Sequence, residues 1–283
     1  MGKFKEKIMK NVFLAAACTS IVAVLLICVF LFYNGIPAMK EIGFLNFLTG
    51  TTWKPKNDVY GILPMILGSI YVTIGAIIIG VPIGILTAVF MARFWPKKFH
   101  KVIKPAIDLL AGIPSVIYGF FGLTVLVPFI RNYIGGNGSG ILTASVLLGI
   151  MILPTIISVS EASINSVPNS YYEGALALGA THERSVFCAV LPAAKSGIMA
   201  GVILGIGRAI GETMAVIMVA GNQARIPTDI LKGVRTLTAN IVLEMGYATD
   251  LHREALIATG VVLFIFILII NFAFAMVKRR QKN

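Results

Sequence analysis

Long runs of apolar residues constrain this chain more than any other feature of its sequence. Six segments of about 20 residues or more are almost free of charge, and a helix of that length crosses the apolar part of a bilayer. Lipid offers no hydrogen-bond partners to the backbone, so such segments fold as helices. The spans are expected at about 12–33, 63–91, 107–130, 141–159, 196–220 and 255–277, with Pro114 interrupting the third. The sequence therefore predicts an all-α integral membrane protein with six transmembrane helices.

Composition agrees with this fold class and excludes others. Of the 283 residues 57% are hydrophobic and 13% are charged, whereas soluble domains carry about 25% charged residues. The net charge of +12 does not indicate a nucleic-acid partner, because the basic residues gather at the ends of spans and do not alternate with aromatic residues. Three cysteines and three separated histidines form no disulfide framework and no metal motif. Membrane lipid is thus the expected surrounding.

The basic residues also predict how the chain is oriented. Fifteen Lys and Arg fall in the two termini and in the connections after the second and fourth spans, against eight in the other three connections. The positive-inside rule places the first group in the cytoplasm. We therefore expect a multi-pass membrane protein with both termini in the cytoplasm. The outer segment 221–253 is expected to hold a helix around 236–245, on the membrane surface or dipping into the protein.

A polar loop at about 161–195, between the fourth and fifth spans, has the local signals of two short helices. Ser170 and Glu173 have the spacing of a capping box, which starts a helix. Gly179 can adopt a positive φ and end that helix. Thr181 can cap a second helix, and Pro192 suits the start of the next span. This pattern predicts a helix, a corner and a helix on the cytoplasmic side.

The same loop resembles the coupling loop of ABC-importer permeases, whose pattern is E-A-A-x3-G-x9-I-x-L-P. The positions that match in register are Glu173, Ala175, Gly179, Leu191 and Pro192. Gly174 and Ala189 depart from the pattern. In that family the loop docks in a groove of a separate ATPase subunit. The resemblance implies that ATPase coupling falls to Glu173, Gly174, Ala175, Gly179 and Thr181.

Charged residues inside the fifth span form the second strong signal. Arg208 and Glu212 are four residues apart, so on one continuous helix they would share a face and could form an ion pair. A charge near the bilayer centre costs at least about 2.5–3.5 kcal/mol, so it normally faces protein or water and serves a function. Arg208 could bind oxyanion oxygens through its planar fork. Glu212 could hold the guanidinium or accept a proton, and Thr213 could add a hydroxyl contact; a purely structural ion pair is the alternative.

Two further features are expected to be structural. Glycines at 197, 201 and 205 form one helix face and those at 207 and 211 another, and such faces let helices approach closely. Asp108 lies four residues after Lys104, which favours a local ion pair over a role in transport.

The run Arg208-Ala209-Ile210-Gly211-Glu212-Thr213-Met214-Ala215-Val216 resembles the signature of phosphate-specific ABC permeases of the PstC type. Residues 60–64, 110–119 and 236–241 agree with that resemblance. It implies a MetI-like type I importer permease in a bacterial or archaeal cell membrane: a first helix and outer loop over 1–59, then the permease domain over 60–283. In the family, the arginine and glutamate matched by Arg208 and Glu212 are linked to phosphate translocation.

The resemblance also implies partners. They are a sister permease of the PstA type in a heterodimer, a dimer of ATP-binding cassette subunits inside, and a phosphate-binding protein outside. The chain has no G-x-x-x-x-G-K-[ST] phosphate loop, so we expect it to be no enzyme and to bind no cofactor. ATP and Mg²⁺ would be bound by the ATPase partner.

Three other functions stay open at this point. The same machine could import another oxyanion, such as sulfate, molybdate or phosphonate. A proton- or sodium-coupled secondary carrier would need no ATPase and leaves the Glu173 loop unexplained. A non-transporting membrane assembly or signalling protein is the third alternative.

Overall fold

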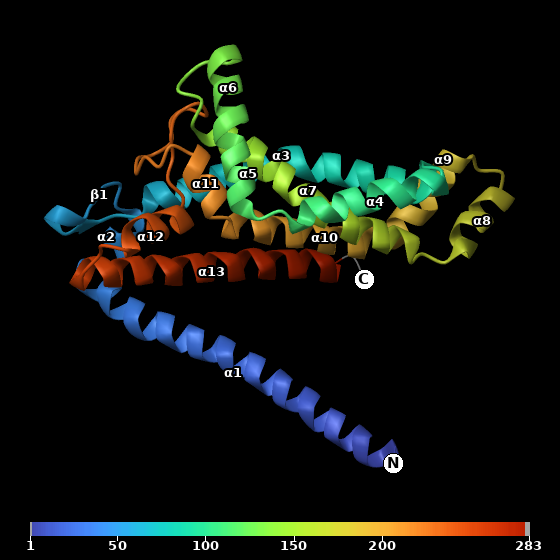
Figure 1. The fold of residues 1–283 in the computed structure, drawn as a ribbon, viewed down its shortest axis with the longest axis horizontal. Helices are drawn as coiled ribbons and strands as arrows, with labels where there is room; N and C mark the ends of the chain where they lie inside the picture. The colour runs from blue at the N-terminus through green and yellow to red at the C-terminus, as the bar shows by residue number, and fades with distance from the viewer. Residues whose placement is uncertain (1, 281–283) are drawn as a thin grey trace.

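The computed structural model describes residues 2–280, and this part of the chain is almost entirely helical (Figure 1). Six helical runs within it are long and apolar enough to cross a membrane. Their bounds are Lys5–Ile42, Leu63–Phe94, Ser115–Tyr133, Ile141–Asn165, His182–Gly211 and Asp250–Ala273. The predicted fold class, an all-α multi-pass membrane protein with six transmembrane helices, is confirmed.

The elements follow one another in a simple order. The first half contains α1 (Gly2–Ile42), α2 (Phe44–Thr49), β1 (Trp53–Lys54), β2 (Val59–Tyr60), α3 (Leu63–Val89), α4 (Lys97–Gly112), α5 (Ser115–Phe121) and α6 (Val127–Tyr133). The second half contains α7 (Ile141–Asn165), α8 (Asn169–Ala177), α9 (His182–Ser185), α10 (Leu191–Gly211), α11 (Met214–Val219), α12 (Leu237–Met245) and α13 (Asp250–Arg280). Short 3₁₀ and π segments η1 (Pro55–Asn57), η2 (Phe90–Phe94), η3 (Gly122–Leu126) and η4 (Val186–Val190) join some of them.

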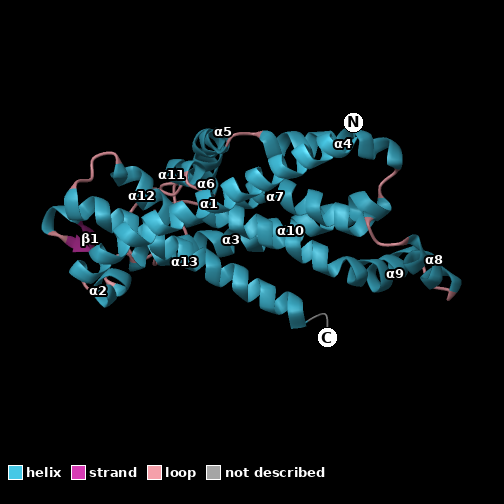
Figure 2. Cartoon of the chain, turned by 90° about the horizontal axis from the view of Figure 1, so that it is seen from below, coloured by secondary structure: helices cyan, strands magenta, loops and turns pink. Residues whose placement is uncertain are grey.

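Helix α7 is the centre of the bundle. It lies between α3 and α10, and the three helices run side by side (Figure 2). Its side chains Leu147, Met151, Ile152 and Ile156 are almost completely buried. Because α7 is covered on most of its circumference, the other spans are positioned relative to it.

Close packing of α7 with α10 depends on glycine. A Cβ atom on Gly197 would lie 2.0 Å from Oγ and 2.5 Å from Cβ of Ser163, and one on Gly205 would lie 2.8 Å from a side-chain carbon of Ile156. The glycine face at 197, 201 and 205 is therefore a packing face, as predicted. The second face, with Gly207 and Gly211, has open space beside it.

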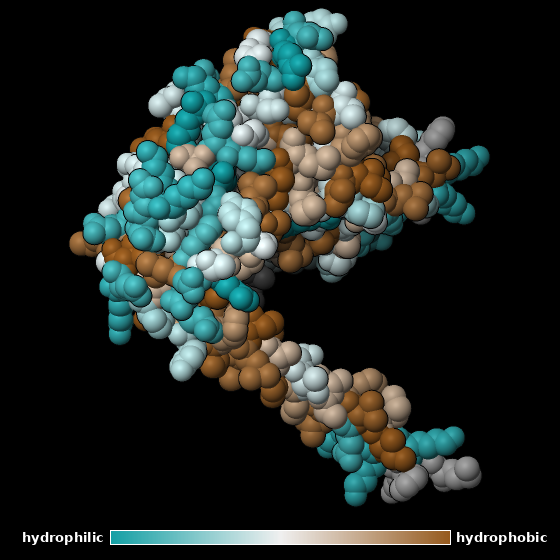
Figure 3. All heavy atoms as spheres, turned by 60° about the vertical axis from the view of Figure 1, so that its left-hand side comes forward, coloured by the Kyte–Doolittle hydropathy of each residue, from teal (hydrophilic) through white to brown (hydrophobic). Residues whose placement is uncertain are grey.

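Helix α1 leaves the bundle (Figure 1). Its second half packs against α13, where the rings of Phe32 and Phe264 meet edge to face with centroids 6.0 Å apart. Its first half is exposed and apolar except at its end, as the colours of Figure 3 show. Contact between such an apolar surface and water is unfavourable. The surface is therefore suited to contact with lipid or with another transmembrane helix.

Two of the predicted spans differ from the structure in their bounds. The third was expected to begin near residue 107, but the backbone is extended at Ile113 and Pro114, so residues 97–112 form the separate helix α4. The fifth was expected to run from about 196 to 220, but it begins at His182 and ends at Gly211. Pro192 does not start it: a π segment, Val186–Val190, precedes the proline and keeps the helix continuous where Pro192 has no N–H to donate.

The predicted helix near residues 236–245 is α12, and it packs into the protein against α3 and α13. Its Glu244 is buried and satisfied by three donors: the indole Nε1 of Trp53 at 2.8 Å, His252 Nε2 at 2.9 Å and Arg235 Nη1 at 2.5 Å. Nearby, burial and a hydrogen bond to Asp58 raise the pKa of Tyr60 to about 12. This polar cluster holds the β1–β2 hairpin against α12 and the start of α13.

We predict that Gly197→Ala destabilises the protein, because the new methyl group overlaps the Cβ atom of Ser163, which no rotation can move. Overpacking of this kind costs about 1–3 kcal/mol. Thermal unfolding of the purified protein in detergent measures it as a lower midpoint. Gly207→Ala is the matched control on the same helix: its methyl group meets open space, and replacing a helical glycine gains about 0.5–1 kcal/mol. Equal midpoints for the two variants would contradict the packing described here.

Candidate functional site

Two breaks in the helical chain meet on one side of α7, one before the third span and one after the fifth. Helix α10 ends at Gly211 and the chain resumes as α11 at Met214, while α4 ends at Gly112 and resumes as α5 at Ser115. The segments after the two breaks pack together: a Cβ on Gly119 of α5 would lie 2.9 Å from Cα of Ala215 in α11. At membrane depth, non-helical backbone is tolerated only where it is buried in protein or lines a water-filled cavity. The breaks therefore mark this region as the candidate site.

Arg208 lies in the last turn of α10, beside the first break. Its Nη1 donates to Oγ1 of Thr155 on α7 at 3.4 Å. The hydroxyl of Tyr118 on α5 lies close enough to interact electrostatically with the guanidinium. In the described part of the chain no carboxylate lies within ion-pair distance of it. The side chain is half-buried. The guanidinium thus keeps an uncompensated positive charge, which is the condition for attracting an anion.

The expectation that Arg208 and Glu212 form an ion pair on one helix face is wrong in this structure. Helix α10 ends at Gly211, and Glu212 has an extended backbone with ψ 132°. The carboxylate instead accepts the backbone N–H of Ala215 at 3.1 Å, and the carbonyl of Glu212 accepts the hydroxyl of Thr238 at 3.0 Å. Glu212 therefore holds the first turn of α11 and ties the break to α12.

Thr213 sits within the same break and is half-buried. Its hydroxyl donates to the carbonyl of Gly211 at 3.2 Å, which satisfies one of the carbonyls freed at the end of α10. A contact between this hydroxyl and a ligand remains a prediction.

The face of α10 that carries Arg208 is open. Gly207 and Gly211 have no neighbour within 4 Å of where a side chain would begin, and Leu204 is exposed. Around the axis of α10 this face lies next to the tightly packed one at 197, 201 and 205, and Arg208 itself reaches α7 through Thr155. An arginine on an unfilled, glycine-lined face can contact a ligand or a second protein without displacing any packed side chain.

The predicted coupling loop folds as α8, a corner and α9, with one correction. Ser170 does not cap α8, because Pro168 takes the N-cap position and Ser170 falls inside the helix. The capping box is therefore wrong, since a proline with its fixed φ starts the helix two residues earlier. Thr181 does cap α9, accepting the N–H of Arg184 at 3.3 Å.

Gly179 ends α8 with φ 83°. The N–H of Gly179 bonds the carbonyl of Leu176 at 2.9 Å, and the N–H of Ala180 bonds that of Ala175 at 3.1 Å. These two bonds are those of a Schellman motif, which needs a left-handed residue at this position. The predicted role of Gly179 as the end of the helix is confirmed.

The loop projects from one end of the bundle, the end at which both ends of the described chain lie (Figure 1). No residue of α8 is buried, and Glu173, Gly174 and Thr181 are exposed. Leu178 at the corner is 90% exposed. This side chain is available for an apolar contact with another protein. Ala175, the remaining predicted coupling residue, is half-buried.

The predicted ion pair of Asp108 is confirmed: its carboxylate lies 3.3 Å from Nζ of Lys104. Lys104 also reaches Glu161 of α7 at 3.3 Å, and His100 contacts the same carboxylate. This cluster fastens α4 to α7 and does not approach Arg208 through any contact of the described residues. Among residues 2–280 no three metal-ligating side chains come together.

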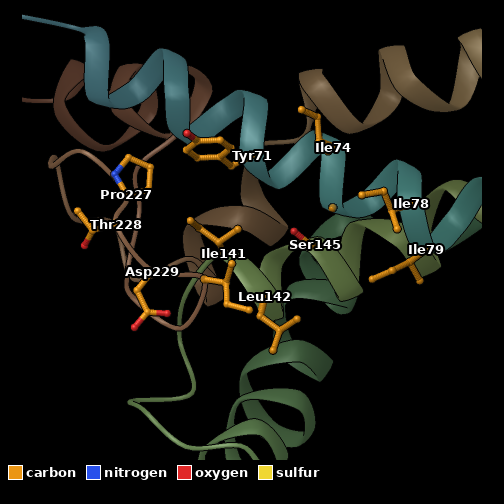
Figure 4. Close-up of a pocket in the computed structure, with 12 residues that line it drawn as sticks. Tyr71, Ile74, Ile78, Ile79, Ile141, Leu142, Ser145, Pro227, Thr228 and Asp229 are labelled. Carbon is orange, nitrogen blue, oxygen red and sulfur yellow. The ribbon is translucent and has the colours of Figure 1, made fainter.

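A cavity of about 460 Å³ lies elsewhere, between α3, the start of α7 and the loop around Asp229 (Figure 4). Apolar residues line most of it, among them Ile74, Ile78 and Ile141. Its charged group is the carboxylate of Asp229, which would repel an anion. This cavity is therefore not an oxyanion site.

The sequence did not indicate three residues that shape the site: Thr155, Tyr118 and Thr238. Tyr118 and Thr238 fall in the stretches 110–119 and 236–241 that carry the family resemblance, and the structure brings both stretches to the breaks around Arg208. Thr155 follows Pro154 in an apolar span and is one of several hydroxyl residues there. Its place opposite Arg208 follows from packing alone.

Comparisons with known proteins agree with this architecture. Over 269 residues the chain is 42% identical to the probable ABC transporter permease protein YqgH of Bacillus subtilis, covering 91% of this chain and 87% of that protein. It is 37% identical to the phosphate transport system permease protein PstC of Mesorhizobium japonicum, covering 90% and 84%. Among solved structures, an inward-facing MetNI methionine ABC transporter superposes with a TM-score of 0.64 at 20% identity, over 81% of this chain and 99% of that one.

The family match gives the assignment. Residues 80–283 match the family described as binding-protein-dependent transport system inner membrane component. The match begins inside α3, so the expected division at residues 59 and 60 stays a prediction. This chain belongs to that family of transport permeases.

Proposed function

We propose that the chain is the transmembrane permease subunit of an ATP-driven phosphate importer, and that phosphate passes Arg208. The observation that carries this proposal is the uncompensated guanidinium at the break of α10, on a face that nothing in the described chain fills. A planar guanidinium fork matches the geometry of phosphate oxygens. The similarity to phosphate transport permeases favours phosphate over sulfate, molybdate or phosphonate.

The open face of α10 needs a second protein to close a pathway. A sister permease of the PstA type, related by pseudo-symmetry, would supply the other wall. The chain's membership in a binding-protein-dependent family supports an extracytoplasmic phosphate-binding protein as the donor of phosphate. Transit also requires that Arg208 release its ligand, so high affinity would reside in the binding protein.

The driving subunit would dock on α8 and α9. Helix α8 is exposed, a Schellman motif forms the corner between α8 and α9, and Leu178 at this corner offers an apolar contact. A dimer of ATP-binding cassette subunits, which would bind ATP and Mg²⁺, would hold this segment on the cytoplasmic side. Both termini would then be cytoplasmic, as the distribution of Lys and Arg predicts.

Replacing Arg208 by Ala is expected to abolish phosphate uptake in proteoliposomes that contain the assembled transporter. The variant removes the group that attracts the anion, and co-purification of the partner subunits controls for assembly. Arg208→Lys keeps a point charge but loses the fork, so we expect about 10-fold slower uptake, the effect of about 1.4 kcal/mol. Uptake at the wild-type rate in Arg208→Ala would remove Arg208 from the pathway.

Two variants separate the two possible roles of Glu212, holding the start of α11 or interacting with the ligand. If it holds the start of α11, Glu212→Gln should transport within about threefold of wild type, because an amide oxygen can still accept the N–H of Ala215. Glu212→Ala should then be slower by roughly 10-fold, since a lost cap costs about 1 kcal/mol or more. Initial rates of uptake measure both. Loss of transport in Glu212→Gln would instead indicate that the carboxylate takes a proton or a charge from the ligand.

Gly179 tests the coupling segment. Gly179→Val should uncouple ATP hydrolysis from uptake or release the ATPase subunit, because a β-branched residue at φ 83° costs about 1–2 kcal/mol and distorts the corner. Gly179→Asn is the control, since asparagine tolerates the left-handed conformation. The measured quantity is phosphate imported per ATP hydrolysed. Identical ratios in the Val and Asn variants would show that the geometry of this corner has no part in coupling.

A further inference from the structure

A polar cavity, separate from the isoleucine-containing one, lies at the end of the bundle that carries the coupling segment, α8 and α9. Its volume is about 420 Å³. Four separate parts of the fold supply polar groups that line it: Arg93 from η2 at the end of α3, His100 from α4, Asn165 from the end of α7, and Tyr172 and His182 from α8 and α9. No carboxylate lines it. We name it the inner anion pocket.

Arg93 is held in place but not saturated. Its Nη2 donates to the carbonyl of Ile164 at 2.9 Å, which fixes the side chain against the end of α7. Its Nε is buried and has no hydrogen-bond partner within the described chain. A buried N–H without a partner is unfavourable and invites an acceptor. The residue also lies in a π segment, a distortion that occurs often at functional sites.

His182 faces the cavity from the coupling side. Its Nδ1 shares a hydrogen bond with the hydroxyl of Tyr172 at 2.8 Å, so the contact between α8 and α9 fixes the ring. Its ring also stands edge-on to that of Phe94, with centroids 4.8 Å apart. The other ring nitrogen, Nε2, makes no hydrogen bond to any described residue. The pocket thus offers one unused donor on the core and one unused ring nitrogen on the coupling segment.

The nearest buried carboxylate does not cancel the positive charge. Glu161 lies behind the pocket, but its two oxygens are taken by His100 and by Lys104, the latter at 3.3 Å. The cavity is open to the outside on this side, because Asn165 is exposed and the side chain of His100 is 35% exposed. A small anion can therefore enter without any rearrangement of the fold.

We propose that the inner anion pocket binds a phosphoryl oxyanion and that its occupancy slows import. The guanidinium of Arg93 supplies the charge and the planar donors that phosphoryl oxygens match, and His182, Tyr172 and Asn165 supply further polar contacts. The ligand is either free inorganic phosphate or the phosphate of an anionic lipid headgroup. The proposal rests on the proposed function, which places this end of the bundle in the cytoplasm.

The effect on transport follows from where the contacts come from. A ligand that contacts both Arg93 on the core and His182 on α9 stabilises the conformation in which the two side chains lie close enough to bind it together. Transport requires the coupling segment to move with the ATPase, so a bound anion adds a free-energy cost to that movement. Imported phosphate would in this way reduce its own further import.

The test uses the complete transporter in proteoliposomes that contain ATP, with labelled phosphate and the binding protein outside. Initial uptake is compared with and without unlabelled phosphate inside, in vesicles of phosphatidylcholine and in vesicles that also contain phosphatidylglycerol. We expect wild type to be slowed at least about fivefold by one of the two anions, the lower end of usual coupling between sites. Arg93→Gln keeps a hydrogen-bond donor for the Ile164 carbonyl, and it should transport at the basal rate without being slowed.

Two more variants make the result decisive. Lys98→Gln removes a positive charge from an exposed residue outside the pocket and should be slowed as wild type is. Asn165→Ala changes an exposed lining residue and should be slowed less than wild type, which keeps the test valid if Arg93→Gln fails to fold. Slowing by internal phosphate identifies free phosphate as the ligand, and slowing by phosphatidylglycerol identifies the lipid.

The proposed inhibition through the inner anion pocket would be overturned if neither anion slowed wild-type uptake. Equal slowing of wild type, Arg93→Gln and Asn165→Ala would also overturn it. In both cases uptake itself would persist and the proposed function would stand. Failure of the proposed function looks different, because the wild-type complex would then import no phosphate under any condition.

Discussion

The architecture around α10 depends on a single charge, the guanidinium of Arg208, which finds no counter-charge among the described residues. Placing a guanidinium in an apolar surrounding is unfavourable, and proteins normally compensate it with a carboxylate. Here the nearby acidic residue, Glu212, is turned away by the end of the helix and satisfies the start of α11 instead. Arg208 is left with one long hydrogen bond to a threonine. Two breaks in the helical chain and an open, glycine-lined face surround Arg208. They leave room for an anion beside its guanidinium.

The same helix connects this charge to the exposed loop. From His182 to Gly211 the chain forms one helical run of 30 residues, about 45 Å long at 1.5 Å per residue. The run begins at the corner fixed by Gly179 and Thr181 and ends at the break next to Arg208. The π segment before Pro192 preserves its continuity. A displacement of the loop can therefore be transmitted to the site along this one helical run, which packs on α7.

Much of this could be predicted from the sequence, for reasons specific to membrane proteins. The spans were predictable because lipid forces apolar segments into helices, and Gly179 and Thr181 were predictable because local turn chemistry decides their roles. The break at Pro114 was predictable as well, because proline interrupts a helix. The separation of α4 from the third span and the end of α10 at Gly211 were not, because they depend on tertiary packing. The spacing of Arg208 and Glu212 suggested a pair only under the assumption of a continuous helix. Thr155 and the inner cavity around Arg93 come from long-range contacts that no local pattern encodes.

We propose that the charge of Arg208 is reserved for the transported anion. A high-resolution structure of the assembled transporter, trapped with nucleotide and phosphate, tests it most directly. We expect density for a tetrahedral anion within hydrogen-bond distance of the Arg208 guanidinium, at roughly 2.7–2.9 Å from a nitrogen. A carboxylate of the sister permease occupying that position, with phosphate elsewhere in the pathway, would contradict the claim and reduce Arg208 to a structural ion pair between the two permeases.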